Sequence, residues 1–275
     1  MLLLAAVNQF FLGIDIYLAH RISGTIVPNE WIPIIFGPAA GTLLLIAGLL
    51  ALRRRDTAAL LANLIFVASI FVGLLGAYFH LERAILPAAP PGQRVNIPLL
   101  VWAPPILGPL TFSLVGLIGI SAAWVEKPAD SGRLMLIAGR SIQLPYSKTN
   151  AFLFMTSLGT LATVISSVLD HARTGFINPW LWIPTVTGVF GVLVAFGLGA
   201  LQSPSRAEIA VYFSAMIALI LTGVIGSWLH IQEDLTSSGQ FVAERFIRGA
   251  PFLAPMLFAN MGALGLIALL DPREE

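Results

Sequence analysis

Long apolar stretches dominate this sequence and determine the environment in which it can fold. A helix needs roughly 20 apolar residues to cross the hydrocarbon layer of a bilayer, and the chain offers eight such stretches. Only 11% of its 275 residues are charged and 57% are hydrophobic, whereas about a quarter of the residues in soluble domains are charged. We therefore predict an all-α integral membrane protein with eight transmembrane helices, over residues 2–20, 31–52, 58–80, 98–124, 150–170, 180–201, 207–230 and 251–270.

Charge and cysteine content exclude several classes of function. The 15 Lys and Arg residues nearly balance the 14 Asp and Glu residues, which leaves a net charge of +1. The chain therefore lacks the basic field that nucleic-acid binding needs. Because it contains no Cys, disulfides, thiolate metal sites and covalent c-type haem are excluded. The sequence carries no nucleotide-binding loop or hydrolase signature, and it leaves open whether the protein is an enzyme.

The distribution of basic residues orients the predicted helices. Eight crossings place both termini on one side of the membrane. Nine basic residues fall on that side and six on the other, and the run Arg53–Arg55 directly follows a span. Since positive charge next to a span favours the cytoplasm, we predict a multi-pass protein of the cell (plasma) membrane with both termini cytoplasmic. Residues 125–149 then form a cytoplasmic linker, predicted to be a weakly amphipathic stretch along the membrane surface.

Two spaced motifs occur twice and indicate an internal duplication. HRISGTIVPNEWIP begins at His20 and aligns without a gap on HARTGFINPWLWIP, which begins at His171. GLLGAYFH and GVIGSWLH, which end at His80 and His230, share the pattern GxxGxxxH. We therefore predict two homologous four-helix units, residues 1–124 and 150–275, joined by the linker. Because each unit crosses the membrane an even number of times, the repeats are parallel.

All four His residues of the chain belong to these motifs. His20 and His171 end the first span of each unit, and His80 and His230 end the third. Since first and third spans run in the same direction, the four imidazoles are predicted near the non-cytoplasmic face. Glycines lie four and seven residues before each third-span His, where they suit either a flat macrocycle or close helix packing. Taken alone, they favour packing; they are Gly73, Gly76, Gly223 and Gly226.

This layout resembles the membrane cytochrome b family, in which alternate helices of a four-helix bundle each give one His to a bis-imidazole haem. The resemblance implies that haem b binds between His20 and His80 and between His171 and His230. It implies a redox subunit of a larger membrane complex that transfers electrons between quinol and an external partner. The family carries His pairs near both faces, whereas this chain has one pair per unit, near one face. Arginines that could pair with haem propionates are Arg21, Arg94, Arg173, Arg245 and Arg248.

Two other interpretations use the same His residues. Imidazole also binds copper, zinc or iron directly, and nearby carboxylates could add ligands or orient the rings; these are Asp15, Glu82, Asp170 and Glu233. Without a metal, the His residues would serve a transporter as proton or substrate contacts, or anchor a structural subunit at the interface. The repeated Trp-Ile-Pro element is predicted to set the start of the second span in each unit.

Overall fold

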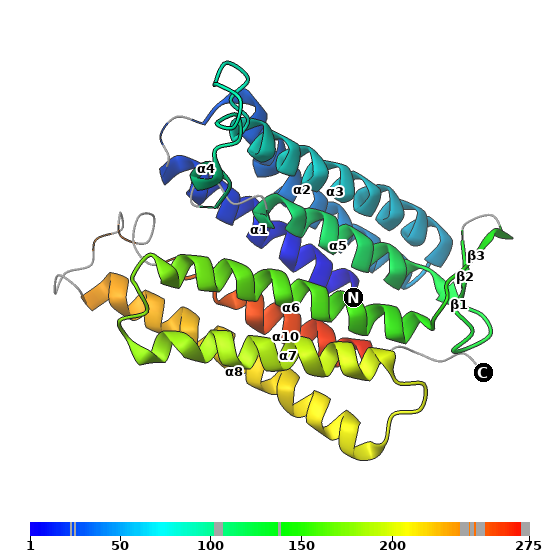
Figure 1. The fold of residues 1–275 in the computed structure, drawn as a ribbon. Helices are drawn as coiled ribbons and strands as arrows, with labels where there is room; N and C mark the ends of the chain where they lie inside the picture. Colours follow the sequence, from blue (N-terminus) through cyan, green and yellow to red (C-terminus); the bar gives the residue numbers. More distant parts are fainter. Residues whose placement is uncertain are drawn as a thin grey trace. The chain divides into compact units, whose positions relative to one another are not determined.

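A computed structural model of the chain describes residues 1–22, 24, 26–101, 107–136, 139–236, 242, 245 and 251–270. The chain divides into two compact units. Unit 1 comprises Met1–Tyr17 and Thr25–Ala123, and unit 2 comprises Leu18–Gly24 and Trp124–Glu275. Helices dominate both units, as the sequence predicts (Figure 1).

Small residues hold the helices of unit 1 together. Gly37 of α2 lies so close to α1 that a Cβ there would stand 2.7 Å from the Gln9 carbonyl oxygen. α2 also packs on α3, and α3 packs on α5. The elements of this unit are α1 (Leu2–Ile22, most of which belongs to it), η1 (Pro28–Glu30), α2 (Trp31–Ala51), α3 (Arg55–Arg83), α4 (Ile97–Val101) and α5 (Leu107–Ala123).

In the described part of unit 2, four helices form a closed ring. α6 packs on α7, α7 on α8, α8 on α10, and α10 again on α6. α6 and α8 therefore lie diagonally across the ring, and they run in the same direction (Figure 1). The helices of the unit are α6 (Lys148–Ala172), η3 (Pro179–Leu181), α7 (Trp182–Ala200), α8 (Arg206–Thr236) and α10 (Met256–Ala268).

The linker between the two predicted repeats contains a small sheet. Within residues 125–149, which are predicted to be a weakly amphipathic stretch along the membrane surface, lies an antiparallel sheet of β1 (Val125–Glu126), β2 (Arg133–Met135) and β3 (Ser141–Gln143). Gly132 and Gly139 have φ angles of 72° and 73°, which break a helix and favour turns. One Glu126 carboxylate oxygen accepts from the backbone N–H of Gly132 at 2.6 Å and of Lys148 at 3.1 Å. These bonds fasten the sheet to the start of α6.

The helices match six of the eight predicted spans closely. Among the described residues, six helices are long and apolar enough to cross a membrane: Leu2–Arg21, Pro28–Ala51, Arg55–Arg83, Lys148–Ala172, Pro179–Ala200 and Arg206–Leu235. The predicted spans 98–124 and 251–270 are represented by shorter apolar helices, α5 with 17 residues and α10 with 13. At about 1.5 Å per residue, both fall short of the roughly 30 Å hydrocarbon layer. Pro255 directly precedes α10, as expected for a residue that starts helices but interrupts them when internal.

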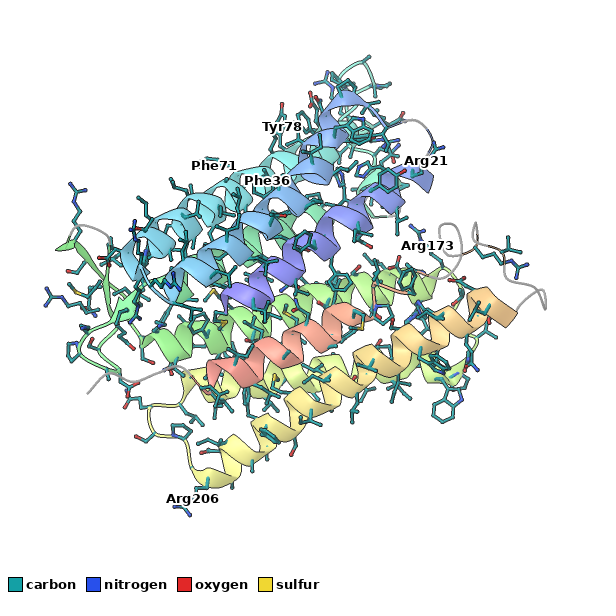
Figure 2. All side chains as sticks on the ribbon, turned by 180° about the vertical axis from the view of Figure 1, so that it is seen from behind. Arg21, Phe36, Phe71, Tyr78, Arg173 and Arg206 are labelled. Carbon is teal, nitrogen blue, oxygen red and sulfur yellow. The ribbon has the colours of Figure 1, made fainter. Side chains whose placement is uncertain are left out.

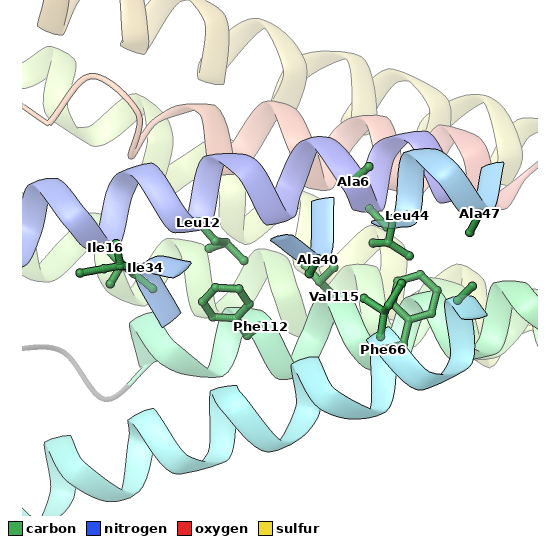
Figure 3. Packing of buried hydrophobic residues seen from close by; sticks show 13 residues of the cluster. Ala6, Leu12, Ile16, Ile34, Ala40, Leu44, Ala47, Phe66, Phe112 and Val115 are labelled. Carbon is green, nitrogen blue, oxygen red and sulfur yellow. The ribbon is translucent and has the colours of Figure 1, made fainter. Parts of the chain in front are cut away.

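Each unit has its own apolar core and an apolar outer surface. In unit 1 the core includes Leu12, Leu44, Phe66 and Phe112, which come from four different helices (Figure 3). Phe36 meets Phe112 edge to face, with ring centroids 5.7 Å apart. Large apolar side chains are also exposed, among them Phe71 (Figure 2), Leu158, Val186 and Leu193, each more than 60% exposed. Such a surface is compatible with a lipid environment.

A buried polar contact links α1 to α3 and yields a first prediction. The Gln9 side-chain amide donates to the Ser69 hydroxyl at 2.7 Å, and both residues are fully buried. We expect Ser69→Ala to lower the free energy of unfolding by about 1 kcal/mol, because the buried amide loses its acceptor. Thermal unfolding of the purified protein in detergent measures this change.

Ser214 provides a matched control, because its hydroxyl donates to the carbonyl four residues earlier, as that of Ser69 does, but its side chain is exposed. Ser214→Ala should change stability little. The double variant Gln9→Leu/Ser69→Ala should recover part of the loss, since it leaves no polar group without a partner at that contact. Strictly additive effects of Gln9→Leu and Ser69→Ala would show that the contact does not contribute to stability.

Candidate histidine site

The diagonal helices of unit 2 place two of the four His residues at the same end of the unit. His171 lies in the last turn of α6, and His230 lies near the end of α8. Since these helices run in the same direction, both imidazoles stand at one end of the ring. His171 interacts electrostatically with His230 and with Asp170, and Asp170 also interacts with Arg173. His171, His230 and Asp170 thus lie at the same end of unit 2, within electrostatic range of one another.

The ring of His230 is oriented by a backbone carbonyl. Its Nδ1 atom lies 3.1 Å from the carbonyl oxygen of Pro251, in the segment that leads to α10. A ring protonated at Nδ1 donates to that oxygen and keeps the lone pair on Nε2. Metal-binding His residues commonly use this pattern, in which a carbonyl fixes one nitrogen and the other binds. His230 can therefore act through Nε2 as a ligand or as a proton acceptor.

The ring of His171 is part of the connection between α6 and α7. It meets Phe176 edge to face, with ring centroids 6.0 Å apart, and Phe176 stacks on Trp182 at 4.4 Å. The His171 ring also forms a hydrogen bond with the backbone of Leu181, and its Nδ1 atom lies 3.5 Å from the Ser167 hydroxyl. The duplicated motif in unit 2 thus orders the turn before α7, as predicted for its Trp-Ile-Pro element.

A left-handed turn makes this aromatic stack possible. Gly175 and Phe176 have φ angles of 66° and 52°, and the positive φ of Phe176 is uncommon for a residue with a side chain. Asn178 then accepts a hydrogen bond from the backbone N–H of Trp180 at 3.1 Å, and Pro179 begins η3. The chain reverses in a few residues, which returns Phe176 to the His171 ring.

The four glycines of the GxxGxxxH motifs lie in helix contacts. A Cβ on Gly223 would stand 2.5 Å from the Ala259 nitrogen and 2.8 Å from the Pro255 carbonyl oxygen of the segment that forms α10. In unit 1, a Cβ on Gly73 would stand 2.6 Å from the Ser113 nitrogen. Gly226 and Gly76 face Pro255 and Pro109 in the same way. The segments that form α5 in unit 1 and α10 in unit 2 fill the space beside the glycines. The glycines therefore do not provide the open groove expected for a macrocycle.

The partners of these glycines carry a repeat that the two His motifs did not include. The pattern LxPxxFxxxGxxG occurs at residues 107–119 and again at 253–265. A Cβ on Gly116 would meet the Phe66 carbonyl oxygen and Ile70. A Cβ on Gly262 would meet the Met216 carbonyl oxygen and Ile220. The same contacts therefore occur in both units. A search for repeats across the fourth predicted span would have found these residues from the sequence.

The predicted His pair of the first repeat is not assembled within one unit. His20 lies in the last turn of α1, in the segment Leu18–Gly24 that groups with unit 2, whereas His80 lies in α3 of unit 1. Both side chains are half-buried. This pair therefore stays a prediction.

The predicted arginines and acids are dispersed over several segments. Arg173 interacts with Asp170 near the His pair, while Arg94 donates to the Ala89 carbonyl oxygen at 3.4 Å. Arg21 is exposed and Arg245 is half-buried; Arg248 lies outside the described residues.

Three or more His, Asp or Glu side chains do not converge on a potential metal site anywhere in the described part of the chain. The convergence of four His residues on one metal, or of carboxylates on a His pair as further ligands, is therefore not seen there. Asp15 is exposed on α1. Glu82 lines a small cavity of about 260 Å³ at the end of α3, together with Tyr78 and Pro87.

A comparison of the chain with protein-family models, with curated proteins and with solved structures finds no match in any of the three.

Proposed function

We propose that the protein is a membrane-embedded redox subunit whose second unit binds b-type haem between His171 and His230. One observation carries the proposal: the parallel, diagonal helices α6 and α8 bring the two imidazoles to the same end of a four-helix ring. The eight crossings, the duplicated units and the cytoplasmic termini belong to this proposal. The contacts shared by the glycines of both units support the duplication.

The two His residues fit a bis-imidazole site to different degrees. His230 keeps Nε2 for an iron atom while the Pro251 carbonyl holds its other nitrogen. His171 already contacts Ser167 and the Leu181 backbone, so one of these contacts must open for its ring to bind iron. Arg173 lies close enough to interact with Asp170 and could pair with a haem carboxylate. When bound, haem supplies a one-electron couple; quinol on one side and an external protein on the other are the proposed partners, within a larger complex.

The absorption spectrum of the purified protein tests this function. We expect a Soret band that shifts on reduction and haem in at least a one-to-one ratio to the chain. The protein should be purified from cells supplied with a haem precursor, so that haem supply does not limit loading. Colourless protein that also fails to bind added haem would contradict the proposal. Copper or zinc in stoichiometric amount would favour the direct metal site, with ligands beyond the His pair.

A second function, without metal, is favoured by the contacts of His171. Its ring joins Leu181 and Phe176 in the turn before α7, which is a structural role at a span end. In that case we expect the protein to be colourless and His171→Ala to lower its free energy of unfolding by about 1 kcal/mol. The matched variant Thr174→Val removes a hydroxyl that donates to the His171 carbonyl oxygen at 2.8 Å but keeps the ring. Equal effects of the two variants would argue against a specific role of the imidazole.

A further inference from the structure

The turn between α2 and α3 concentrates positive charge at one end of unit 1. α2 ends at Ala51 and α3 begins at Arg55, and Arg53, Arg54 and Arg55 are all exposed. The backbone N–H groups of Arg53 and Arg54 both donate to the Leu50 carbonyl oxygen, at 3.0 Å and 2.7 Å. The turn is therefore tight, and its arginines lie directly between the ends of two apolar helices.

Bare apolar side chains lie next to these arginines. Leu52, in the turn itself, is 82% exposed, and Leu49, in the last turn of α2, is 71% exposed. A molecule that carries a phosphate and a hydrocarbon chain would contact both kinds of group at once. A soluble phosphate would use only the arginines. The combination therefore suits an amphiphile.

The corresponding turn of unit 2 lacks this character. Between α7 and α8 the chain reads Leu-Gln-Ser-Pro-Ser-Arg, with Arg206 at the start of α8. The Ser205 N–H donates to the Glu208 carboxylate at 2.6 Å, and the Glu208 N–H donates to the Ser205 hydroxyl at 3.3 Å. One basic and one acidic residue give this turn no net charge, whereas Arg53–Arg55 with Asp56 carry a net charge of +2. The turn of unit 2, which Arg206 marks in Figure 2, is thus an internal reference.

We propose that the α2–α3 turn of unit 1 is a binding site for the phosphate of an anionic phospholipid, with Arg53 and Arg54 as its contacts and Leu49 and Leu52 beneath the acyl chains. Guanidinium binds phosphate oxygens in pairs through its planar N–H groups. Each basic residue near an anionic membrane surface strengthens binding by about fivefold. This proposal is independent of the redox function, because it involves no residue of the His site.

Lipid retention by the purified full-length protein tests the site. The protein is held in mixed micelles of a neutral detergent with phosphatidylglycerol or phosphatidylcholine, and bound lipid is measured by native mass spectrometry. We expect Arg53→Gln/Arg54→Gln to weaken phosphatidylglycerol binding by about 25-fold, from two contributions of about fivefold each. Phosphatidylcholine binding should stay the same. Arg206→Gln, the matched variant in unit 2, should change phosphatidylglycerol binding less than twofold, because Arg206 and Glu208 leave that turn without net charge.

Three results would overturn the site. They are unchanged phosphatidylglycerol binding in the double variant, an equal loss in Arg206→Gln, and displacement of the lipid by inorganic phosphate at equal concentration, which would indicate a simple anion site. Because Arg53, Arg54 and Arg206 are exposed, the variants should keep the helical content and thermal stability of the parent. Circular dichroism verifies this for the samples used. Micelles also separate lipid binding from any effect of charge on membrane insertion.

Discussion

His230→Ala is expected to remove haem from unit 2 completely. The substitution deletes one of the two proposed iron ligands and the ring that the Pro251 carbonyl holds in place at 3.1 Å. The measurement is haem per chain, from the Soret band and extraction of the pigment. His80→Ala is the matched control, because His80 occupies the same place in the repeated motif but lies in unit 1. That variant should keep at least one haem per chain.

Imidazole rescue separates a ligand from a structural residue. Free imidazole added to His230→Ala protein should restore haem binding, because it can occupy the space left by the side chain and supply the nitrogen. A structural role would not respond to the small molecule. A His230→Ala protein that keeps its full Soret band without imidazole would refute the assignment of His230, whatever the spectrum of the parent.

Gly223→Ala is expected to lower the free energy of unfolding by about 3 kcal/mol. The new Cβ would stand 2.5 Å from the Ala259 nitrogen and 2.8 Å from the Pro255 carbonyl oxygen. Both are backbone atoms, so the contact can be relieved only by separation of α8 from the segment that forms α10. Denaturation of the purified protein in detergent, followed by helical circular dichroism, measures the change.

Gly197→Ala is the control for this substitution. Gly197 is also helical, but a Cβ there would meet no atom within 4 Å, and alanine favours helices over glycine by up to about 1 kcal/mol. This variant should be as stable as the parent or slightly more stable. If the two variants lost equal stability, the close contact between α8 and α10 would be incorrect.

The glycine contact and the His site are mechanically connected. Gly223 and Gly226 let the segment before α10 approach α8, where the Ser227 hydroxyl donates to the Phe252 carbonyl oxygen at 2.7 Å. The Pro251 carbonyl that orients His230 belongs to the residue just before Phe252. We therefore expect Gly223→Ala to weaken haem binding in addition to stability, whereas Gly197→Ala should leave it unchanged. The glycines influence the site through helix packing, and they do not line a cofactor groove.

Hydropathy predicted the helices well because it is a local property. The predicted span 31–52 corresponds to Trp31–Ala51, and 150–170 corresponds to Lys148–Ala172. Apolar side chains in a continuous run favour a helix in lipid irrespective of their partners. The sheet within the linker was not predicted, since a weak amphipathic pattern does not reveal the turns at Gly132 and Gly139. The strand register that pairs Leu134 with Ile142 depends on those turns.

From the sequence alone, this chain is a helical protein suited to a membrane, with two spaced motifs that each occur twice. Spacing along a helix also places His171 and His230 at the ends of parallel helices, because rise and direction are local quantities. Only the tertiary structure decided which helices are neighbours. The ring of α6, α7, α8 and α10 sets His171 and His230 across from one another, and the contact of Gly223 with Ala259 depends on residues far apart in the sequence. Such pairings arise from packing between segments, which the pattern within each segment does not encode.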